Sequence, residues 1–571
     1  MEMMTRMLGF GLAAILSAAS LFAASDVADA AMRGNKEAVR SLLLRKADAN
    51  IPQADGTTAL HWAVQANNLE LADMLLNAGA KASAANHDGA PPMLLATING
   101  NAAMVERLIK GGADPNATLT RVGNTPLMIA SRTGKIDAVK VLLDHGAKVN
   151  TKETWGDTTA LMWAVAEKHS DIAKLLVEHG ADVKARSKFV PNTTGRGFEG
   201  SAPVDAKPNQ APEEQSGGLM TALMFAAREG DLASARTLVA AGADINALTG
   251  DGKDALGLAV FSGNYDLASF LVDSHAKVDH PDAQGFTALY WAVDRRNMET
   301  APNFPWQFTA DPLPLTKKLL DAGADPNKLI NNTPRARMRE GSPRVRYATV
   351  IQRAAFSGDL EVVKLLLAHG ADPHIQSEDR ETTLMAACGN GFISGYHKSR
   401  SPAERLEVVK LLIQQGEDVN AADNAGISPL MMAANFGDVP IVQYLIDKGA
   451  DLDAHDLGKK NDGAFGASDE PLEALDYAIG VGTFRPNNAI LQHEDVEKLL
   501  RKVMTEKGIE PTTSECTLRG FTCSSVNVDP FSASPADIER MRKMQIGNRV
   551  DGITGGLAVA EKDKEKAKDQ K

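Results

Sequence analysis

A short motif that returns about every 33 residues is the strongest constraint on the fold of this chain. TALHWAV begins at Thr58, TPLMIAS at Thr125 and TALMWAV at Thr159, and further copies begin at Thr221 and Thr287. A polar turn and a second apolar segment follow each of these copies, and most repeats close with a Gly-Ala-Asp-x-Asn sequence or a variant of it. A fixed period of this length indicates a stack of similar units rather than a series of globular domains.

Each unit predicts two short helices and a turn. The Thr or Ser before the first apolar segment can cap a helix, and Pro126 follows where a helix tolerates a missing N–H. Gly79 and Gly112 stand where the second helix must end, because glycine adopts the left-handed conformation at low cost. Asp-x-Asn and the next Asp-Gly predict a hairpin-like finger. One helix pair cannot bury its own apolar face, so neighbouring units must stack.

These motifs resemble the ankyrin repeat, whose Thr-Pro-Leu-His-x-Ala and Gly-Ala-Asp-x-Asn patterns match the chain from about Asp26 to Gly508. The resemblance implies an all-α solenoid of about twelve helix-turn-helix units with short hairpin fingers. Only His61 keeps the family histidine, which is mostly Met in the other units, so we expect most units to lose the hydrogen bonds of that histidine without losing the fold.

The repeats divide into two runs. Repeats one to five occupy residues 26–188, and repeats six to twelve occupy residues 219–508. The intervening residues 189–218 are rich in Pro, Gly, Asn and Glu, which predicts a flexible insertion. After Gly508 the period is lost, and residues 509–571 predict a mostly disordered C-terminal tail. Shorter insertions within the second run are expected at 299–314, 328–346, 392–404 and 456–471.

Residues 1–25 predict export. Arg6 precedes an uncharged run from Met7 to Ala24, and a small-residue site, Ala23-Ala24-Ser25, ends it, which is typical of a cleavable signal peptide. The alternative is a retained membrane anchor, since the run approaches the ~18 apolar residues that could span a bilayer. Cleavage would place the protein in the periplasm or outside the cell, without membrane contact.

Cysteine usage and net charge limit the chemistry further. In an oxidising compartment, Cys516 and Cys523 could form a disulfide across a small loop. Cys388 occupies a position where the motif usually has Ala, so we expect an inert, buried thiol. A formal net charge of −12 argues against nucleic acid as a partner, because phosphate binding requires clustered Lys and Arg.

In ankyrin arrays the binding surface is generally the concave face, formed by the fingers and the exposed ends of the first helices. The resemblance therefore implies a similar face here, where aromatic and Arg side chains would anchor a partner. The alternative is that several of these side chains turn inward against the next repeat. The candidates on this face are Trp155, Arg132, Arg228, Phe261, Phe286, Arg295, Phe356 and Phe436.

A second candidate site lies in the insertion 328–346, which carries a local charge of about +5 within an acidic protein. It could bind carboxylate or phosphate groups of a partner, or it could be a solvated loop whose arginines pair with acidic neighbours. Its candidate partner-binding residues are Arg335, Arg337, Arg339, Arg344 and Arg346.

No sequence motif indicates catalysis. The chain lacks an HExxH, a GxSxG and a CxxC pair, and the GxGxxG match at Gly195 lies in an insertion without the required strand and helix. We therefore expect a monomeric, non-catalytic scaffold that uses no cofactor or metal and binds an unidentified protein. The alternatives are an accessory or stabilising subunit of an exported enzyme and a secreted, host-targeted effector.

Overall fold

The computed structural model describes most of the predicted repeats. Within the described residues the chain has twenty-four helices and two strands of two residues each, which confirms the predicted all-α repeat solenoid. The predicted signal peptide, apart from Ser25, and the tail beyond Pro511 lie outside them. The described residues are 25–190, 217–283, 285–298, 310–330, 349–377, 379–389, 400–457, 471–479 and 493–511.

The helices fall into two compact units that divide between Lys277 and Val278. Unit 1 contains seven described helix pairs and unit 2 contains five, so the described helices make up the twelve expected repeats. The helices of unit 1 are α2 (Asp26–Met32), α3 (Lys36–Leu44), α4 (Ala59–Gln65), α5 (Leu69–Asn77), α6 (Pro92–Asn99), α7 (Ala102–Lys110), α8 (Pro126–Arg132), α9 (Ile136–Asp144), α10 (Ala160–Ala166), α11 (Ser170–Glu178), α12 (Ala222–Glu229), α13 (Leu232–Ala240), α14 (Ala255–Phe261) and α15 (Tyr265–Asp273).

Unit 2 has the same alternation of first and second helices. Its helices are α16 (Ala288–Arg296), α17 (Leu313–Asp321), α18 (Val350–Phe356), α19 (Leu360–Ala368), α20 (Thr383–Ala387), α21 (Pro402–Gln414), α22 (Pro429–Phe436), α23 (Val439–Asp447), α24 (Ala474–Ile479) and α25 (Glu494–Glu506).

The helix ends form as the motif predicts. The Thr125 hydroxyl accepts a hydrogen bond from the Met128 amide at 3.3 Å, and Pro126 begins α8. The second helix of the preceding repeat is capped by Asn101, whose side chain accepts from the Met104 amide at 3.1 Å. Gly112 then has a φ of 95°, a value that glycine adopts with little strain. At Asn101, Gly112 and Thr125, the local sequence therefore determines where a helix starts or stops.

The family histidine and its methionine replacements bond differently. His61 contacts the Thr58 amide through Nδ1 at 3.1 Å and the Ala90 carbonyl of the next repeat through Nε2 at 2.9 Å. In α8 the Thr125 amide instead donates to the sulfur of Met128 at 3.4 Å. A thioether accepts only weakly and has no donor. Met128 therefore keeps the contact within its own repeat but has no N–H to offer the next one.

Neighbouring repeats are also joined by the Asn of Asp-x-Asn. The Asn116 side chain donates to the Gly146 carbonyl at 3.1 Å and accepts from the Lys148 amide at 2.7 Å. Asn150 makes the same two bonds to Gly180 and Asp182. Between the helices the core is aliphatic, and side chains such as those of Val139 and Leu142 are fully buried. Polar bonds at the loop edge therefore set the register of an apolar stack.

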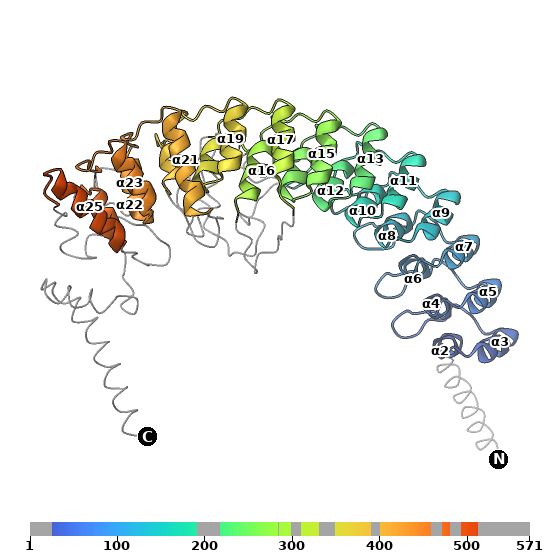
Figure 1. Cartoon of the computed structure of the whole chain (residues 1–571). Helices are drawn as coiled ribbons and strands as arrows, with labels where there is room; N and C mark the ends of the chain where they lie inside the picture. The colour runs from blue at the N-terminus through green and yellow to red at the C-terminus, as the bar shows by residue number, and fades with distance from the viewer. Residues whose placement is uncertain are drawn as a thin grey trace, which may run out of the picture. The chain divides into compact units, whose positions relative to one another are not determined.

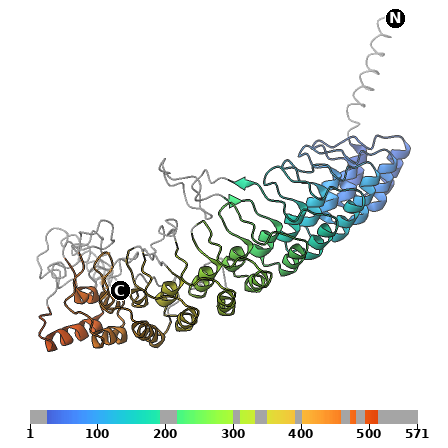
Figure 2. The ribbon, with the colours of Figure 1, turned by 90° about the horizontal axis from the view of Figure 1, so that it is seen from above.

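In unit 1 the first helices lie on the inner side of the curve and the second helices on its outer side (Figure 1). The loops between repeats extend along one edge, and the strands β1 (Phe189–Val190) and β2 (Gly217–Gly218) leave this edge together (Figure 2). They are antiparallel, with Phe189 opposite Gly218. In unit 2, described by itself, α17, α19 and α21 occupy the outer side in the same way (Figure 1).

Candidate protein-binding surface

On the inner side of unit 1, two candidate arginines lie over aromatic rings. Arg132 at the end of α8 is 5.2 Å from the ring centroid of Trp163 in α10, and Arg228 is 5.0 Å from that of Phe225 in its own helix. Both arginines are exposed, whereas both rings are half-buried. Such stacking contributes about 0.5–1 kcal/mol at exposed sites. The stacking restrains each guanidinium, and Arg228 is held further because its Nε donates to Glu229 at 2.7 Å.

Two further candidates in unit 1 differ in exposure. Phe261, the last residue of α14, is half-buried. Trp155 lies at a finger between α9 and α10, and 79% of its surface is exposed. An indole this exposed keeps a large apolar surface in contact with water, and a partner that covered it would gain the free energy of burying that surface. Unit 1 therefore brings an exposed Trp and two exposed, stacked arginines to its fingers and inner helix ends.

Unit 2 places three of its candidates inside. Phe286 and Phe356 are only 6% and 2% exposed, and Arg295 is 6% exposed. Phe286 lies 4.9 Å from the Tyr290 ring and 4.8 Å from the Trp291 ring, and Arg295 lies over Trp291 at 5.6 Å. These side chains turn inward and offer no surface to a partner, which is the alternative that the sequence left open.

Phe436 is half-buried beneath a cation. The guanidinium of Arg405 lies 3.7 Å from its ring centroid and pairs with Asp438 at 3.3 Å. Burial lowers the pKa of Arg405, an effect that Asp438 opposes. Cys388 is fully buried next to this group, and burial raises the pKa of its thiol far above the usual value. The contact between Phe436 and Arg405 therefore joins two repeats from within.

A network of charged residues at the inner ends of α16 and α18 was not anticipated. Arg353 is 1% exposed and pairs with Asp294 at 2.8 Å, while its other nitrogens donate to Ser357 and to the Asn297 carbonyl. Arg353 occupies the repeat position that holds Trp163 in α10. In the sequence, an Arg at a repeat position that holds an aromatic residue in other units was the feature that could have indicated a buried ion pair.

Arg296 continues the network toward the second helices. It bonds to Asp359 and to Glu361, both at 2.8 Å, and also pairs with Asp311. Burial by itself would lower the pKa of Arg296, but the bonds to Asp311 and Asp359 outweigh it and raise the pKa. Arg400 also reaches Asp359 at 2.8 Å. These charges pair with one another across repeats, as expected of a structural network rather than a catalytic acid and base.

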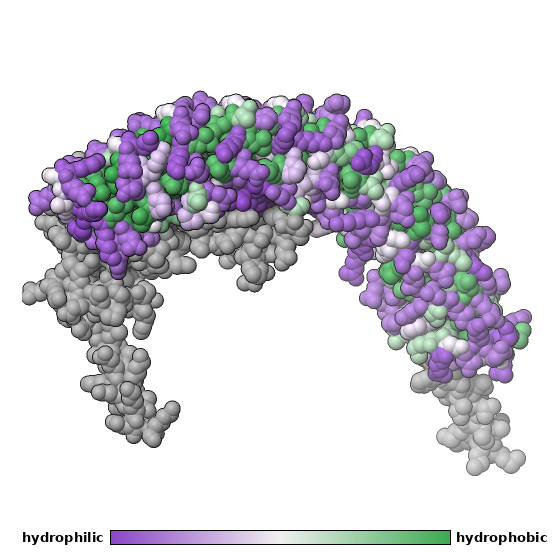
Figure 3. Space-filling view, in the orientation of Figure 1, coloured by the Kyte–Doolittle hydropathy of each residue, from purple (hydrophilic) through white to green (hydrophobic). Residues whose placement is uncertain are grey.

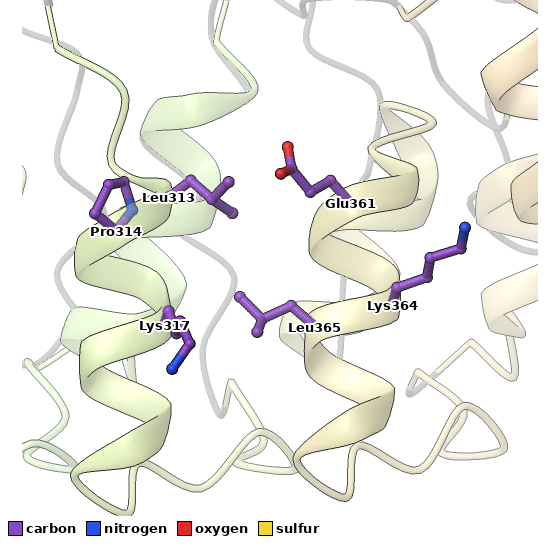
Figure 4. A pocket seen from close by; sticks show the side chains of 6 residues that line it. All are labelled: Leu313, Pro314, Lys317, Glu361, Lys364 and Leu365. Carbon is purple, nitrogen blue, oxygen red and sulfur yellow. The ribbon is translucent and has the colours of Figure 1, made fainter.

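The outer side of unit 2 carries an open hollow between α17 and α19, with a volume of about 420 Å³. Leu313 and Leu365 approach each other across it, whereas Lys364 points away (Figure 4). The small apolar surface at the base of this hollow is similar to the separate hydrophobic patches that lie among polar residues on other helices of the chain (Figure 3). Its lining residues are Leu313, Pro314, Lys317, Glu361, Lys364 and Leu365.

Several predicted sites lie outside the described residues. These are the five arginines of the basic finger, Arg335, Arg337, Arg339, Arg344 and Arg346, and the cysteine pair Cys516 and Cys523. Among the described residues, no cluster of three His, Cys, Asp or Glu side chains could hold a metal ion. The same residues include no helix that is long and apolar enough to cross a membrane.

Comparison with known proteins assigns the repeat. A family model described as ankyrin repeats (3 copies) matches residues 27–119, 93–187, 221–302 and 351–456, which is more than half of the chain. The similar curated proteins include the ankyrin repeat and KH domain-containing protein mask-1 of Caenorhabditis elegans, 32% identical over 127 residues. That alignment covers 22% of this chain and 4% of the relative.

Two other relatives are similar over comparable lengths. Ankyrin repeat domain-containing protein 63 of Homo sapiens is 36% identical over 84 residues, which are 15% of this chain and 19% of that protein. Alpha-latrocrustotoxin-Lt1a of Latrodectus tredecimguttatus is 27% identical over 132 residues, which are 23% of this chain and 8% of the toxin. The alignments thus span only a small part of each relative and share the repeat itself. The capped helix pairs, the fingers and the family match together establish that this chain belongs to the ankyrin-repeat family.

Proposed function

We propose that this protein is a non-catalytic scaffold that binds a protein partner through the inner side and finger edge of its repeats. The observation that carries the proposal is the exposure, on these surfaces of unit 1, of Trp155, Arg132 and Arg228. Trp and Arg are enriched among the residues that dominate binding energy at protein interfaces. Ankyrin repeats are generally protein-interaction modules, and the charged network of unit 2 is occupied in internal ion pairs.

Site-specific photo-crosslinking in the native host tests this proposal. A photoreactive amino acid would replace Arg132 or Arg228 on the inner side, and matched controls would carry it at Lys140 or Lys174 on the outer helices α9 and α11. We expect a discrete crosslinked protein from the inner positions and none from the outer ones. Equal yields at both sets of positions, or no adduct at any, would contradict the proposal.

We further propose that the protein acts in the periplasm or outside the cell as a monomer, after removal of residues 1–25. The uncharged run from Met7 to Ala24 and the small-residue site that ends it support this location. Cell fractionation combined with N-terminal sequencing of the purified protein would test it. An uncleaved N-terminus in the membrane fraction would instead favour the anchor, and sedimentation of the purified protein would test the oligomeric state.

A further inference from the structure

The exposed aromatic residues of the described chain are concentrated at one place. Trp155 is 79% exposed and Phe189 is 44% exposed, and they belong to neighbouring fingers of unit 1. Val122, 41% exposed, lies on the finger before them. Backbone bonds hold the three fingers side by side, because the Thr154 amide donates to the Val122 carbonyl at 2.9 Å and the Lys188 amide to the Gly156 carbonyl at 2.7 Å. We call Val122, Trp155 and Phe189 the finger-tip strip.

Two of these fingers are longer than others in the same unit. The ordinary finger closes when the Gln53 amide donates to the Thr57 carbonyl. In the finger of Val122, the Leu119 amide donates to Asn124, one residue further along, and in the finger of Trp155 the Glu153 amide donates to Thr158. The extra residue lengthens the loop beyond the closing bond, so the apolar side chain sits at a tip without support from the helices.

A buried carboxylate holds the finger of Trp155 in shape. Glu153 is 3% exposed and accepts hydrogen bonds from the Trp155 amide at 2.6 Å, the Gly156 amide at 2.7 Å and the Thr158 hydroxyl at 2.8 Å. Burial by itself would raise the pKa of Glu153, but these hydrogen bonds outweigh it and keep the pKa below its usual range. The tryptophan is therefore presented on a preorganised loop, which lowers the entropic cost of binding.

Within the part of the chain that the structure describes, positive charge surrounds the strip, although the chain as a whole is acidic. Arg121, Lys152 and Lys188 are exposed beside the three apolar tips, and no ion pair joins any of them to another described residue. Lys152 donates a hydrogen bond to the carbonyl of Arg186 at 2.9 Å. Among the described residues of the three fingers (119–124, 153–158 and 185–190), the acids are Asp157 and Glu153, and Glu153 is engaged in the hydrogen bonds given above. Such a surface attracts carboxylates and disfavours a basic partner.

We propose that the finger-tip strip binds an acidic segment of a partner protein, one that places apolar side chains against Trp155 and its neighbours and carboxylates against Arg121 and Lys188. The proposal rests on the protein-binding function above and assigns a surface and a partner chemistry to it. The apolar contacts supply affinity, and the cations select acidic sequences and speed association.

A displayed library of random peptides, selected on the full chain, tests the proposal. Enriched peptides would be synthesised with a fluorophore, and their affinities measured by anisotropy at low and physiological salt. Trp155→Ala is expected to raise Kd at least about 30-fold. The charge reversal Lys188→Glu should weaken binding and reduce its salt dependence. Lys174→Ala, an exposed change on the outer helix α11, is the matched control and should leave Kd unchanged.

A second variant tests the positioning of the tryptophan. Glu153→Gln keeps Trp155 but replaces the carboxylate that accepts from the finger's N–H groups with an amide, whose NH2 group cannot accept these hydrogen bonds. The finger should lose its fixed conformation, and we expect peptide binding to weaken about tenfold. Circular dichroism should remain unchanged for both variants, because the helices do not depend on the finger tip. Unchanged affinity in Glu153→Gln would refute the preorganised presentation of Trp155.

The outcomes separate the two proposals. Enriched peptides that lack acidic residues, or that bind Trp155→Ala as tightly as the parent chain, would overturn the finger-tip proposal while leaving a protein-binding function elsewhere. Failure to enrich any peptide would overturn it as well, but would leave adducts from the inner-side crosslinking as independent support for the scaffold. Competition by a single-stranded oligonucleotide or by phosphatidylglycerol vesicles at physiological salt would show a general anion site and would also overturn it.

Discussion

Replacing Arg353 with methionine is expected to loosen the first helices of unit 2. Arg353 and Asp294 form a 2.8 Å ion pair in which the side chains are 1% and 6% exposed. Removing one partner of a buried pair typically costs about 3–5 kcal/mol, because the remaining charge stays buried without its main partner. The loss of donors to Ser357 and to Asn297 adds about 1 kcal/mol each.

The double variant Asp294→Leu/Arg353→Met separates the charge from the packing. A buried ion pair replaced on both sides by apolar residues is often neutral, since the desolvation penalty disappears together with the attraction. We therefore expect the double variant to recover most of the stability that Arg353→Met loses. The unpaired Ser357 hydroxyl and Asn297 carbonyl should leave a residual cost of about 1–2 kcal/mol.

Hydrogen exchange followed by mass spectrometry measures this locally, which is necessary because repeat arrays need not unfold in one step. A loss of 3 kcal/mol corresponds to exchange more than 100-fold faster in peptides from α16 and α18. Peptides from α8 and α10 in unit 1 are the internal control and should not change. Unaltered exchange in α16 and α18, or a double variant as labile as Arg353→Met alone, would refute the reasoning.

Three further outcomes are expected. Burial, together with the charges of Asp476 and Asp453, raises the pKa of Glu473 from 4.5 to about 7. Between these two pH values the folded chain binds a proton that the unfolded chain does not, so the free energy of unfolding falls as pH rises from about 4.5 to 7. Glu473→Gln should therefore raise the melting temperature of the last repeats at pH 8 and not at pH 4. Cys388 should resist iodoacetamide at pH 8 until denaturant is added, and modification of the native protein, detected by peptide mass, would contradict its burial. Gly437→Ala should cost at least about 1–2 kcal/mol in urea unfolding, because its φ is 82° and the added methyl would meet the His493 ring; an unchanged midpoint would disprove this.

The repeat, its helices and its caps could be predicted from sequence because they depend on local chemistry. Thr125, Pro126 and Gly112 act on neighbouring backbone, so their roles follow from spacing alone. The prediction of about twelve units is confirmed within the described helices. The lengthening of the Trp155 finger was not among the insertions predicted from the sequence, and its conformation depends on contacts such as those of Glu153.

The candidate surface was less predictable because it depends on contacts between repeats. Phe286 follows the finger glycine Gly285, whereas Trp155 precedes Gly156, and this difference of position turns the first side chain inward and the second outward. Phe356 occupies the same helix position as Phe261, yet only Phe356 is fully buried. The exposure of such residues depends on which side chains of the adjacent repeats pack against them. The sequence period predicts mainly the core that all repeats share, so it does not determine this exposure.

The paired strands β1 and β2 also make unit 1 easy to engineer. Phe189 lies opposite Gly218 and Val190 opposite Gly217, so the two ends of the intervening segment are fixed about 5 Å apart. A type I′ turn such as Asn-Gly could join them directly, which would give a shortened chain with the helices intact. A folded reporter domain whose termini lie close together could be grafted at the same place. Because this junction adjoins Phe189, a fluorescent reporter grafted there would lie next to the finger-tip strip. A change in its fluorescence could then report the binding of a partner to the neighbouring fingers.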